Sequence, residues 1–304
     1  MDNMQYLGNG TVHQLLINLT KDEAINFRKT IEKNLRRLLR RCKKEPLLGG
    51  MILMDGLGNP TGVLGAEEVT GYRTSMNVMV PFTWRKNVDN ISITFVNPFK
   101  DQVDTLIATV SKENEARWKS DCSLHFVNTS APDFQQQIET RLSDIDCIFC
   151  TTPFRKPLFP ASYLTKRKSS CRQPFISAIG AWQSDMIELD PALLYHAIAA
   201  DGGYNPVIGE PKGVVLVDDR DYALLNSGEV VQSKLTSQDM VELGQIIALR
   251  SGKLQSLHNK QVEQTNRFIS EGFIVYKSIG VSFTDLTAGN AVLALRQKKK
   301  DHHL

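Results

Sequence analysis

Residues 277–289 combine side chains and a spacing that could bind an anion or a cofactor. The apolar, β-branched run that ends at Tyr276 predicts a strand, and Ser278-Ile279-Gly280 predicts a short turn. The segment that begins at Thr284 then has the capping and acidic residues of a helix N-terminus. In α/β proteins, a strand that passes through a turn of small residues into a helix N-terminus is a common place for anions and cofactors.

Other polar residues offer weaker signals. Thr151 and Thr152 end a predicted strand, where the carboxyl ends of a sheet meet a ligand, although ordinary turn chemistry explains them equally well. Cys147 and Cys150 have C-x-x-C spacing, but no second pair completes a zinc site, and the run around them reads as a buried strand. The histidines form no spaced set, so none is interpreted as a metal ligand or a base.

The elements that would position these residues alternate from Ile91 onward. Strands are predicted at 91–97, 123–127, 145–151, 175–179 and 213–218, and helices at 101–118, 133–142, 191–199, 221–225, 237–249 and 285–298. This alternation predicts an α/β fold with a parallel sheet covered on both faces. Before Ile91, the pattern predicts a helix from Leu19, a β-hairpin over 51–64 and a helix over 67–80.

Composition limits the class of protein. A chain of 304 residues can bury a sizeable core, and 41% hydrophobic with 23% charged residues is typical of a globular protein. The net charge of +3 is too small to indicate nucleic-acid binding. The sequence has no apolar run of membrane-spanning length and no charged-then-apolar leader, so we expect a cytoplasmic protein without a membrane partner.

Four blocks carry a resemblance to a known family. They occur in the family's order and extend over most of the chain, at 67–74, 175–190, 214–220 and 277–289. In wording and spacing the chain resembles the ornithine cyclodeaminase/mu-crystallin family. The resemblance implies a Rossmann-like dinucleotide-binding domain (91–281) inserted in a discontinuous α+β domain (1–90 plus 282–304) for substrate binding and dimerisation. It therefore implies a homodimer.

Two parts of the family pattern are missing. A dinucleotide-binding domain normally opens with a strand, a G-x-G-x-x-G turn and a helix. Here the residues before Ile91 run directly into what resembles the second strand of the family, so one element of roughly 30 residues is lacking. Between Arg41 and Leu47, nothing matches the arginine and lysine with which relatives bind the substrate carboxylate.

The resemblance also implies site residues. Trp182 stands where the cyclodeaminase branch has its proton-transferring aspartate, which favours the imine-reducing branches. Asp185 is the candidate catalytic residue, and capping of the next turn is an equally good interpretation. The candidate cofactor-binding residues are Arg73, Asn97, Thr151, Thr152, Ser177, Ala178, Ile179 and Ser278. Arg73 would reach the cofactor phosphates, unless it forms a surface ion pair. Asn97, uncharged at the ribose position, mildly favours NADP over NAD.

The resemblance implies an NAD(P)-dependent enzyme that acts on small amino or cyclic imino acids. Ketimine reduction or ornithine-to-proline cyclodeamination would give proline- or pipecolate-type products, with a hydride passing between the nicotinamide and the α-carbon. The missing glycine-rich element leaves an alternative, a non-catalytic relative or a truncated gene product that has lost cofactor binding. Two gaps between well-matched blocks are also what wrongly removed exon segments would produce.

Overall fold

The computed structural model describes Glu23, Asn26, Phe27, Lys29 and residues 90–119, 121–143, 145–152, 154–167, 173–181, 183–199, 203–250, 259–280 and 282–301. The first four of these are helical, as expected for a helix that begins near Leu19. The hairpin predicted over 51–64 and the helix predicted over 67–80, which includes Arg73, lie outside the described residues.

The first half of the described chain alternates as the sequence predicts. A π-helical turn, Asn114–Trp118, directly follows the helix Lys100–Glu113. The elements are β1 (Asn90–Asn97), α5 (Lys100–Glu113), β2 (Asp121–Asn128), α6 (Phe134–Leu142), β3 (Cys147–Cys150), α7 (Ser162–Thr165), β4 (Phe175–Ala178) and α8 (Pro191–Ala199).

The second half contains one strand that the sequence interpretation missed. Its elements are β5 (Val215–Val217), α9 (Arg220–Asn226), α10 (Gly228–Gln232), β6 (Met240–Glu242), α11 (Leu243–Arg250), α12 (Asn259–Glu271), β7 (Ile274–Lys277) and α13 (Ser282–Asp301). The single helix predicted over 237–249 is wrong, because a 3-10 turn, Ser237–Asp239, and β6 precede α11. Met240 and Val241 are buried and β6 pairs with β5, and so short an apolar run has no periodicity that separates strand from helix.

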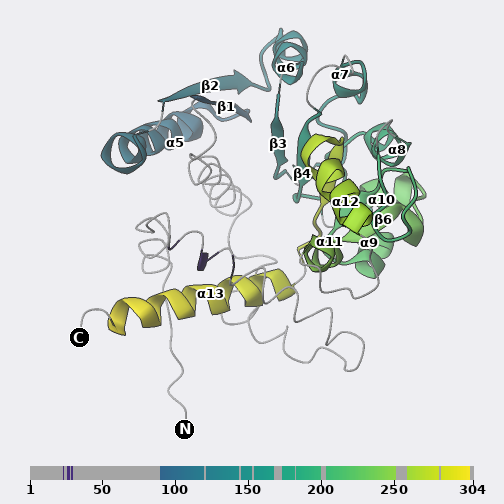
Figure 1. Ribbon diagram of the computed structural model, residues 1–304. Coiled ribbons are helices and arrows are strands. Elements are labelled where there is room, and N and C mark those ends of the chain that lie inside the picture. The colour runs from purple at the N-terminus through teal and green to yellow at the C-terminus, as the bar shows by residue number, and fades with distance from the viewer. Residues whose placement is uncertain are drawn as a thin grey trace.

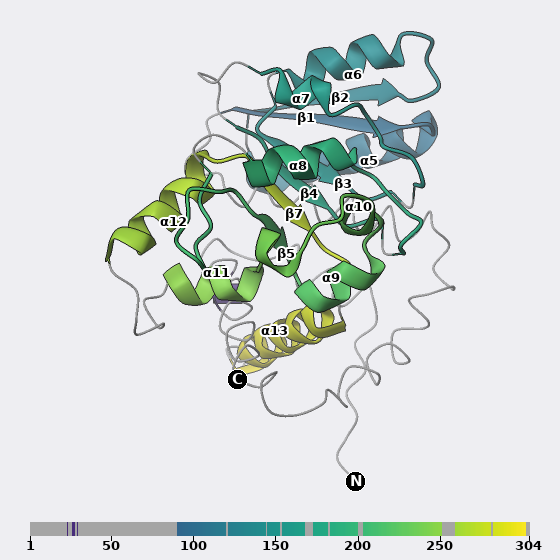
Figure 2. The same ribbon diagram turned by 90° about the vertical axis from the view of Figure 1, so that its right-hand side faces the viewer.

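The strands form parallel pairs throughout, but they make two sheets and not one. β1 pairs with β2 from Asn90↔Asp121 to Asn97↔Asn128, and the other strands follow the order β3-β4-β7-β5-β6. In Figure 2 the two-stranded sheet lies beyond β3, at the end of the five-stranded sheet away from β5. Figure 1 shows the long C-terminal helix α13 apart from both sheets.

The break between the sheets falls where the first strand of a dinucleotide-binding domain is expected. In the usual dinucleotide-binding order, the first strand lies between the second and the fourth. β1 and β2 take the second and third places, and β3 takes the fourth. Among the described residues no pairing joins β1 to β3, and no described strand lies between them.

The main core lies around the five-stranded sheet. Its central strands are near-continuous apolar runs, and Ile176, Ala178, Val215, Val217 and Val275 have no exposed surface. Runs of this kind are typical of parallel strands that are covered on both faces. The two-stranded sheet has a smaller cluster of its own, in which Phe95 packs with Val103 and Val110 of α5. In the part of the chain that the structure describes, no helix has the length and apolar character needed to span a bilayer.

Candidate functional site

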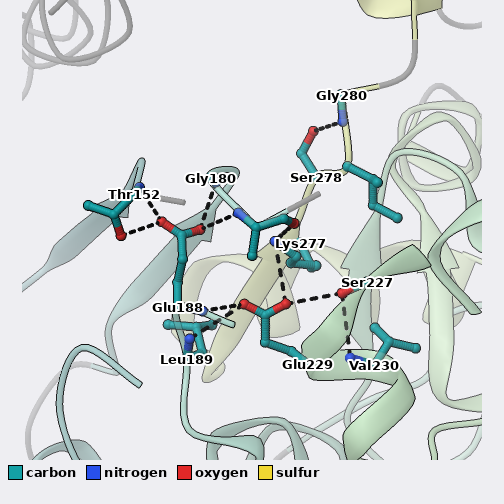
Figure 3. Close-up of polar contacts among 12 residues, drawn as sticks. Thr152, Gly180, Glu188, Leu189, Ser227, Glu229, Val230, Lys277, Ser278 and Gly280 are labelled. Atoms are coloured by element: carbon teal, nitrogen blue, oxygen red, sulfur yellow. Dashed lines mark hydrogen bonds and ion pairs between the residues drawn. The ribbon is translucent and has the colours of Figure 1, made fainter. Parts of the chain in front are cut away.

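The candidate site lies at the carboxyl edge of the five-stranded sheet. Because the strands are parallel, the segments that follow neighbouring strands meet at this edge, as ligand-binding segments do in open α/β sheets. We name four segments by their strands: the β3 loop (151–152), the β4 loop (179–181), the β7 loop (278–280) and the β5 loop (218–219). Figure 3 shows the polar contacts that Glu188, Glu229 and Lys277 make around the β3 and β4 loops.

The carboxylate of Glu188 joins the β3 loop to the β4 loop. Oε1 accepts hydrogen bonds from Thr152 N (2.6 Å) and Thr152 Oγ1 (3.1 Å). Oε2 accepts from Gly180 N (2.7 Å) and Ala181 N (3.3 Å). Each carboxylate oxygen therefore serves one loop, and the side chain is fully buried between them.

Gly180 brings the β4 loop into direct contact with the β3 loop. A Cβ atom at this position would lie 2.3 Å from Thr152 N and 2.4 Å from Thr152 O. Both distances are far below van der Waals contact, and the atoms concerned belong to the backbone. Only a residue without a side chain fits, so the glycine sets how closely the loops approach.

A buried lysine holds the β4 loop from the opposite side. Lys277, the last residue of β7, donates from Nζ to the carbonyl oxygen of Ala181 at 2.7 Å and lies 3.5 Å from Glu229 Oε2. Glu229, on α10, also accepts from the backbone N of Glu188 (2.7 Å) and from Ser227 Oγ (3.2 Å). Lys277 and Glu229 are both fully buried.

The charges of this network do not balance when all groups are ionised, since two carboxylates share one ammonium. Burial raises the pKa of Glu188, and the negative charge of Glu229 acts in the same direction. Lys277 and the backbone hydrogen bonds from Thr152 and Gly180 oppose this shift but do not cancel it. Burial also raises the pKa of the Cys150 thiol, and Glu188 adds to that effect, so the thiol is unsuited to act as a nucleophile.

The β7 loop directs its amides to an internal carboxylate. Asp218, directly after β5, accepts from Ser278 Oγ (2.6 Å), Ile279 N (3.0 Å) and Gly280 N (3.1 Å). Gly280 has a φ of 75°, in the left-handed region that favours glycine. The amides that the sequence suggested for an anionic ligand therefore bind Asp218, which connects the β5 loop to the β7 loop.

Most of the sequence-predicted cofactor residues come together at this edge. Thr151, Thr152 and Ile179 are half-buried, while Ser177, Ala178 and Ser278 are buried. Two backbone hydrogen bonds link neighbouring strands here, from Ile179 N to Cys150 O and from Ser278 N to Ala178 O, each 3.0 Å long. Backbone pairing and side-chain contacts thus fix the same group of loops.

The other predicted residues lie elsewhere. Asn97 ends β1 in the two-stranded sheet, and its Oδ1 accepts from Phe99 N at 2.8 Å. Asp185 is exposed, and its carboxylate forms an ion pair with Arg155 Nε at 2.7 Å. Arg73 and Trp182 lie outside the described residues.

A dinucleotide fits one part of this edge better than another. Its pyrophosphate normally binds free backbone amides at a glycine-rich turn after the first strand. Within the described residues, the β7-loop amides are taken by Asp218, and the strand that would carry the glycine-rich turn is missing between β1 and β3. The described residues therefore do not fit a pyrophosphate in its usual position. Thr151, Thr152 and Ile179 are half-buried and leave accessible atoms where the nicotinamide end is expected.

Sequence reasoning gave no role to Glu188, Glu229 or Lys277. A usable signal was present, because Glu188 stands between Ile187 and Leu189 and Lys277 follows the apolar residues of β7. Charged residues inside apolar runs are rarely buried without partners, so each indicates a paired site. Which residues pair could not be read from the signal, since the partners are far apart in the chain.

Comparisons with known proteins give limited matches. No protein-family model matches the chain. Over 172 residues it is 26% identical to the uncharacterized protein YGL159W of Saccharomyces cerevisiae, and the match covers 56% of this chain and 42% of the yeast protein. The chain thus matches less than half the length of that relative.

Among solved structures, the chain is similar to a probable ornithine cyclodeaminase from Bordetella pertussis Tohama I. The TM-score is 0.42 at 19% identity, and the match covers 78% of this chain and 68% of that protein. At this level of similarity, the fold is defined by the chain's own strand order: an α/β protein with parallel, Rossmann-like sheets.

Proposed function

We propose that the chain is an NAD(P)-dependent enzyme of the ornithine cyclodeaminase/mu-crystallin type that reduces small cyclic imines. Its products would be amino acids of the proline or pipecolate type. Trp182, in place of the proton-transferring aspartate, favours imine reduction over cyclodeamination of ornithine.

One observation carries this proposal. The β3, β4, β5 and β7 loops are held together at the carboxyl edge by charged residues, the buried Glu188 and Lys277 and the half-buried Asp218. Burying charged groups has a large desolvation cost, and such groups are often found where loops must be held in a defined geometry around a ligand. The nicotinamide would bind against the β3 and β4 loops, and a positioned ring and substrate are what this chemistry requires of a protein.

The test is a titration of the purified chain with NADPH and with NADH. Circular dichroism first establishes that the protein is folded, and quenching of tryptophan fluorescence then reports binding. We expect saturable binding with a dissociation constant in the micromolar range, tighter for NADPH than for NADH. A folded protein that binds neither dinucleotide would contradict the proposal.

A matched pair of variants locates the binding. Thr151→Phe adds a ring to the β3 loop at the candidate site, and we expect it to abolish NADPH binding. Thr140→Phe makes the same change on the exposed surface of α6 and should bind as the wild type does. Equal loss in both variants, or in neither, would contradict binding at this edge.

Asp185 can be tested separately as the acid/base residue. Asp185→Asn should lower the rate of imine reduction at saturating substrate if its carboxylate handles the proton. The ion pair with Arg155 is exposed, so the variant should keep the wild-type stability. Unchanged turnover would remove Asp185 from the catalytic residues.

The break between the sheets favours a second candidate, a non-catalytic relative or a truncated gene product. In the part of the chain that the structure describes, the facing edges of β1 and β3 are unpaired, as expected of a parallel sheet that lacks its first strand and the pyrophosphate-binding turn. Sequencing the transcript across the junctions at Arg41–Leu47 and Asn90–Ile91 distinguishes a truncated gene product from a relative that has lost these segments. An insertion of about 30 codons at the second junction would indicate a truncated reading, and an uninterrupted junction would indicate real loss.

A further inference from the structure

The carboxylate of Glu188 connects the two loops that lie nearest the proposed nicotinamide position. The donors to its carboxylate come from both sides, Thr152 on one loop and Gly180 with Ala181 on the other. Three of the donors are backbone N–H groups, whose positions follow the loop backbone directly. A change at this carboxylate therefore acts on the spacing of the loops.

Only an ionised carboxylate can serve all of these donors. Ionised, it is purely an acceptor with free lone pairs on both oxygens. Once protonated, one oxygen becomes a donor that faces N–H groups, so either the Thr152 side or the Gly180 side loses its acceptor. Because Gly180 is already in close contact with the Thr152 backbone, the two loops cannot move closer together to re-form the lost hydrogen bond.

We propose that ionised Glu188 is the positioning residue of the cofactor site, an inference that rests on the proposed function. It holds the β3 and β4 loops at the separation that the nicotinamide end of the dinucleotide requires. Neutral Glu188 lets the loops separate, and dinucleotide affinity falls. Glu188 itself does not touch the cofactor and acts through the two loops.

The groups that face Glu188 set the pH range of this effect. They are Lys277 from β7, Glu229 from α10 and Cys150 from β3. Lys277 favours the ionised form, whereas burial and Glu229 favour the neutral form, and the pKa of Glu188 is raised as the net result. We therefore expect the loops to begin separating during mild acidification, before ordinary surface glutamates are protonated.

The first arm of the test needs no cofactor. Protein labelled with ¹⁵N-glycine is titrated from pH 8 to pH 4.5, and the amide resonances of Gly180 and Gly272 are followed by NMR. Gly180 N donates to Glu188, whereas Gly272 N donates to the backbone oxygen of Phe268 at 2.8 Å and serves as the control. We expect a one-proton titration at Gly180 in the wild type, absent at Gly272 and absent from Gly180 in Glu188→Gln. A flat Gly180 resonance in the wild type would overturn the inference, and this measurement requires no variant to fold.

The second arm measures NADPH affinity at pH 7.5 in the wild type, Glu188→Gln and Glu188→Asp. We expect Glu188→Gln to bind roughly tenfold more weakly, the size of one lost charge-assisted hydrogen bond. Glu188→Asp keeps the charge and should recover part of that loss. Wild-type affinity in folded Glu188→Gln would overturn the inference while leaving the proposed function standing. A wild type that binds no dinucleotide but shows the Gly180 titration would contradict the proposed function and support the role of Glu188 in loop spacing.

Discussion

The carboxyl edges of the two sheets differ in how their loops are held. At the five-stranded sheet, the buried Glu188 and Lys277 and the half-buried Asp218 connect loops that are far apart in the sequence. At the two-stranded sheet, Asn97 and Asn128 each accept from a backbone amide two residues further along. Contacts of the first kind fix loops relative to one another, whereas contacts of the second kind shape one loop at a time.

The cores beneath the two edges differ in the same direction. The five-stranded sheet rests on a large buried cluster that includes α8 residues such as Leu193 and Leu194. The two-stranded sheet relies on the small cluster of Phe95, Val103 and Val110. A pair of strands is marginally stable without further partners, so α5 and α6 must supply much of its stability. The comparison indicates that, among the described residues, long-range polar contacts and a large core support the five-stranded edge, whereas the two-stranded edge has mainly local contacts and a small core.

The largest expected effect comes from removing the buried cation. Lys277→Met leaves Glu188 and Glu229 without their shared counter-charge, and we expect a loss of about 4 kcal/mol in the free energy of unfolding. The matched change in the other region, Lys100→Met, removes an exposed i,i+4 partner of Asp104 and should have no measurable effect. Urea denaturation of both variants gives the comparison. Similar stabilities for the two would mean that the buried network adds nothing to the five-stranded region.

A smaller loss is expected where the loops touch. Gly180→Ala places a Cβ atom against the Thr152 backbone and should lower the free energy of unfolding by about 2 kcal/mol. Gly289→Ala on α13 meets open space and should stabilise its helix by about 1 kcal/mol or less. Thermal unfolding of both variants tests the contact. A neutral Gly180→Ala would show that the β4 loop can move away freely.

Hydrogen exchange compares the two sheets without any mutation. We expect the amides of β1 and β2 to exchange roughly tenfold or more faster than those of β4 and β7, because local opening exposes a smaller core. Mass spectrometry of peptides from each strand supplies the rates. Equal protection would mean that the two sheets open as one unit, and the comparison drawn above would fail.

The pH dependence of stability should distinguish two buried carboxylates. The pKa of Glu188 is raised because burying its ionised form costs free energy, even though that form makes the hydrogen bonds to both loops; the group therefore favours the folded state most below about pH 4.5 and less as pH rises through the shifted pKa. For Asp239, burial alone would raise the pKa, but hydrogen bonds from Lys212 and Thr236 outweigh it and lower the pKa. Its contribution is therefore present above pH 3.8 and is lost as pH falls.

Glu188→Gln should then remove a decline in stability towards neutral pH, and Asp239→Asn should remove a decline towards acid. Denaturation midpoints measured from pH 3 to pH 8 give both slopes. If the two substitutions changed the slope in the same direction, the assignment of opposite shifts would be incorrect.

Much of the alternating fold could be predicted from local patterns. Helix α8 was placed with its observed bounds, and β1, β2, β4 and β7 were found because their apolar, β-branched runs are bounded by turn residues. β6 was missed because its run is short, and α12 was missed because a mostly polar segment forms it. The sequence predicted where the candidate site lies, at the carboxyl edge of the sheet, and it predicted some of the residues of the site.

The sequence by itself determined the strand–helix alternation and carried the family resemblance, because both depend on residues that are neighbours in the chain. Only the tertiary structure decided that the described strands divide into two sheets between β1 and β3 and that Glu188, Glu229 and Lys277 meet in one buried network. Lys277 donates to Ala181, 96 positions away in the chain, and Asp218 accepts from Ser278, 60 positions away. Local periodicity reports which face of an element is buried, but not which distant charge it will meet there, because that choice is made by the packing of the whole sheet.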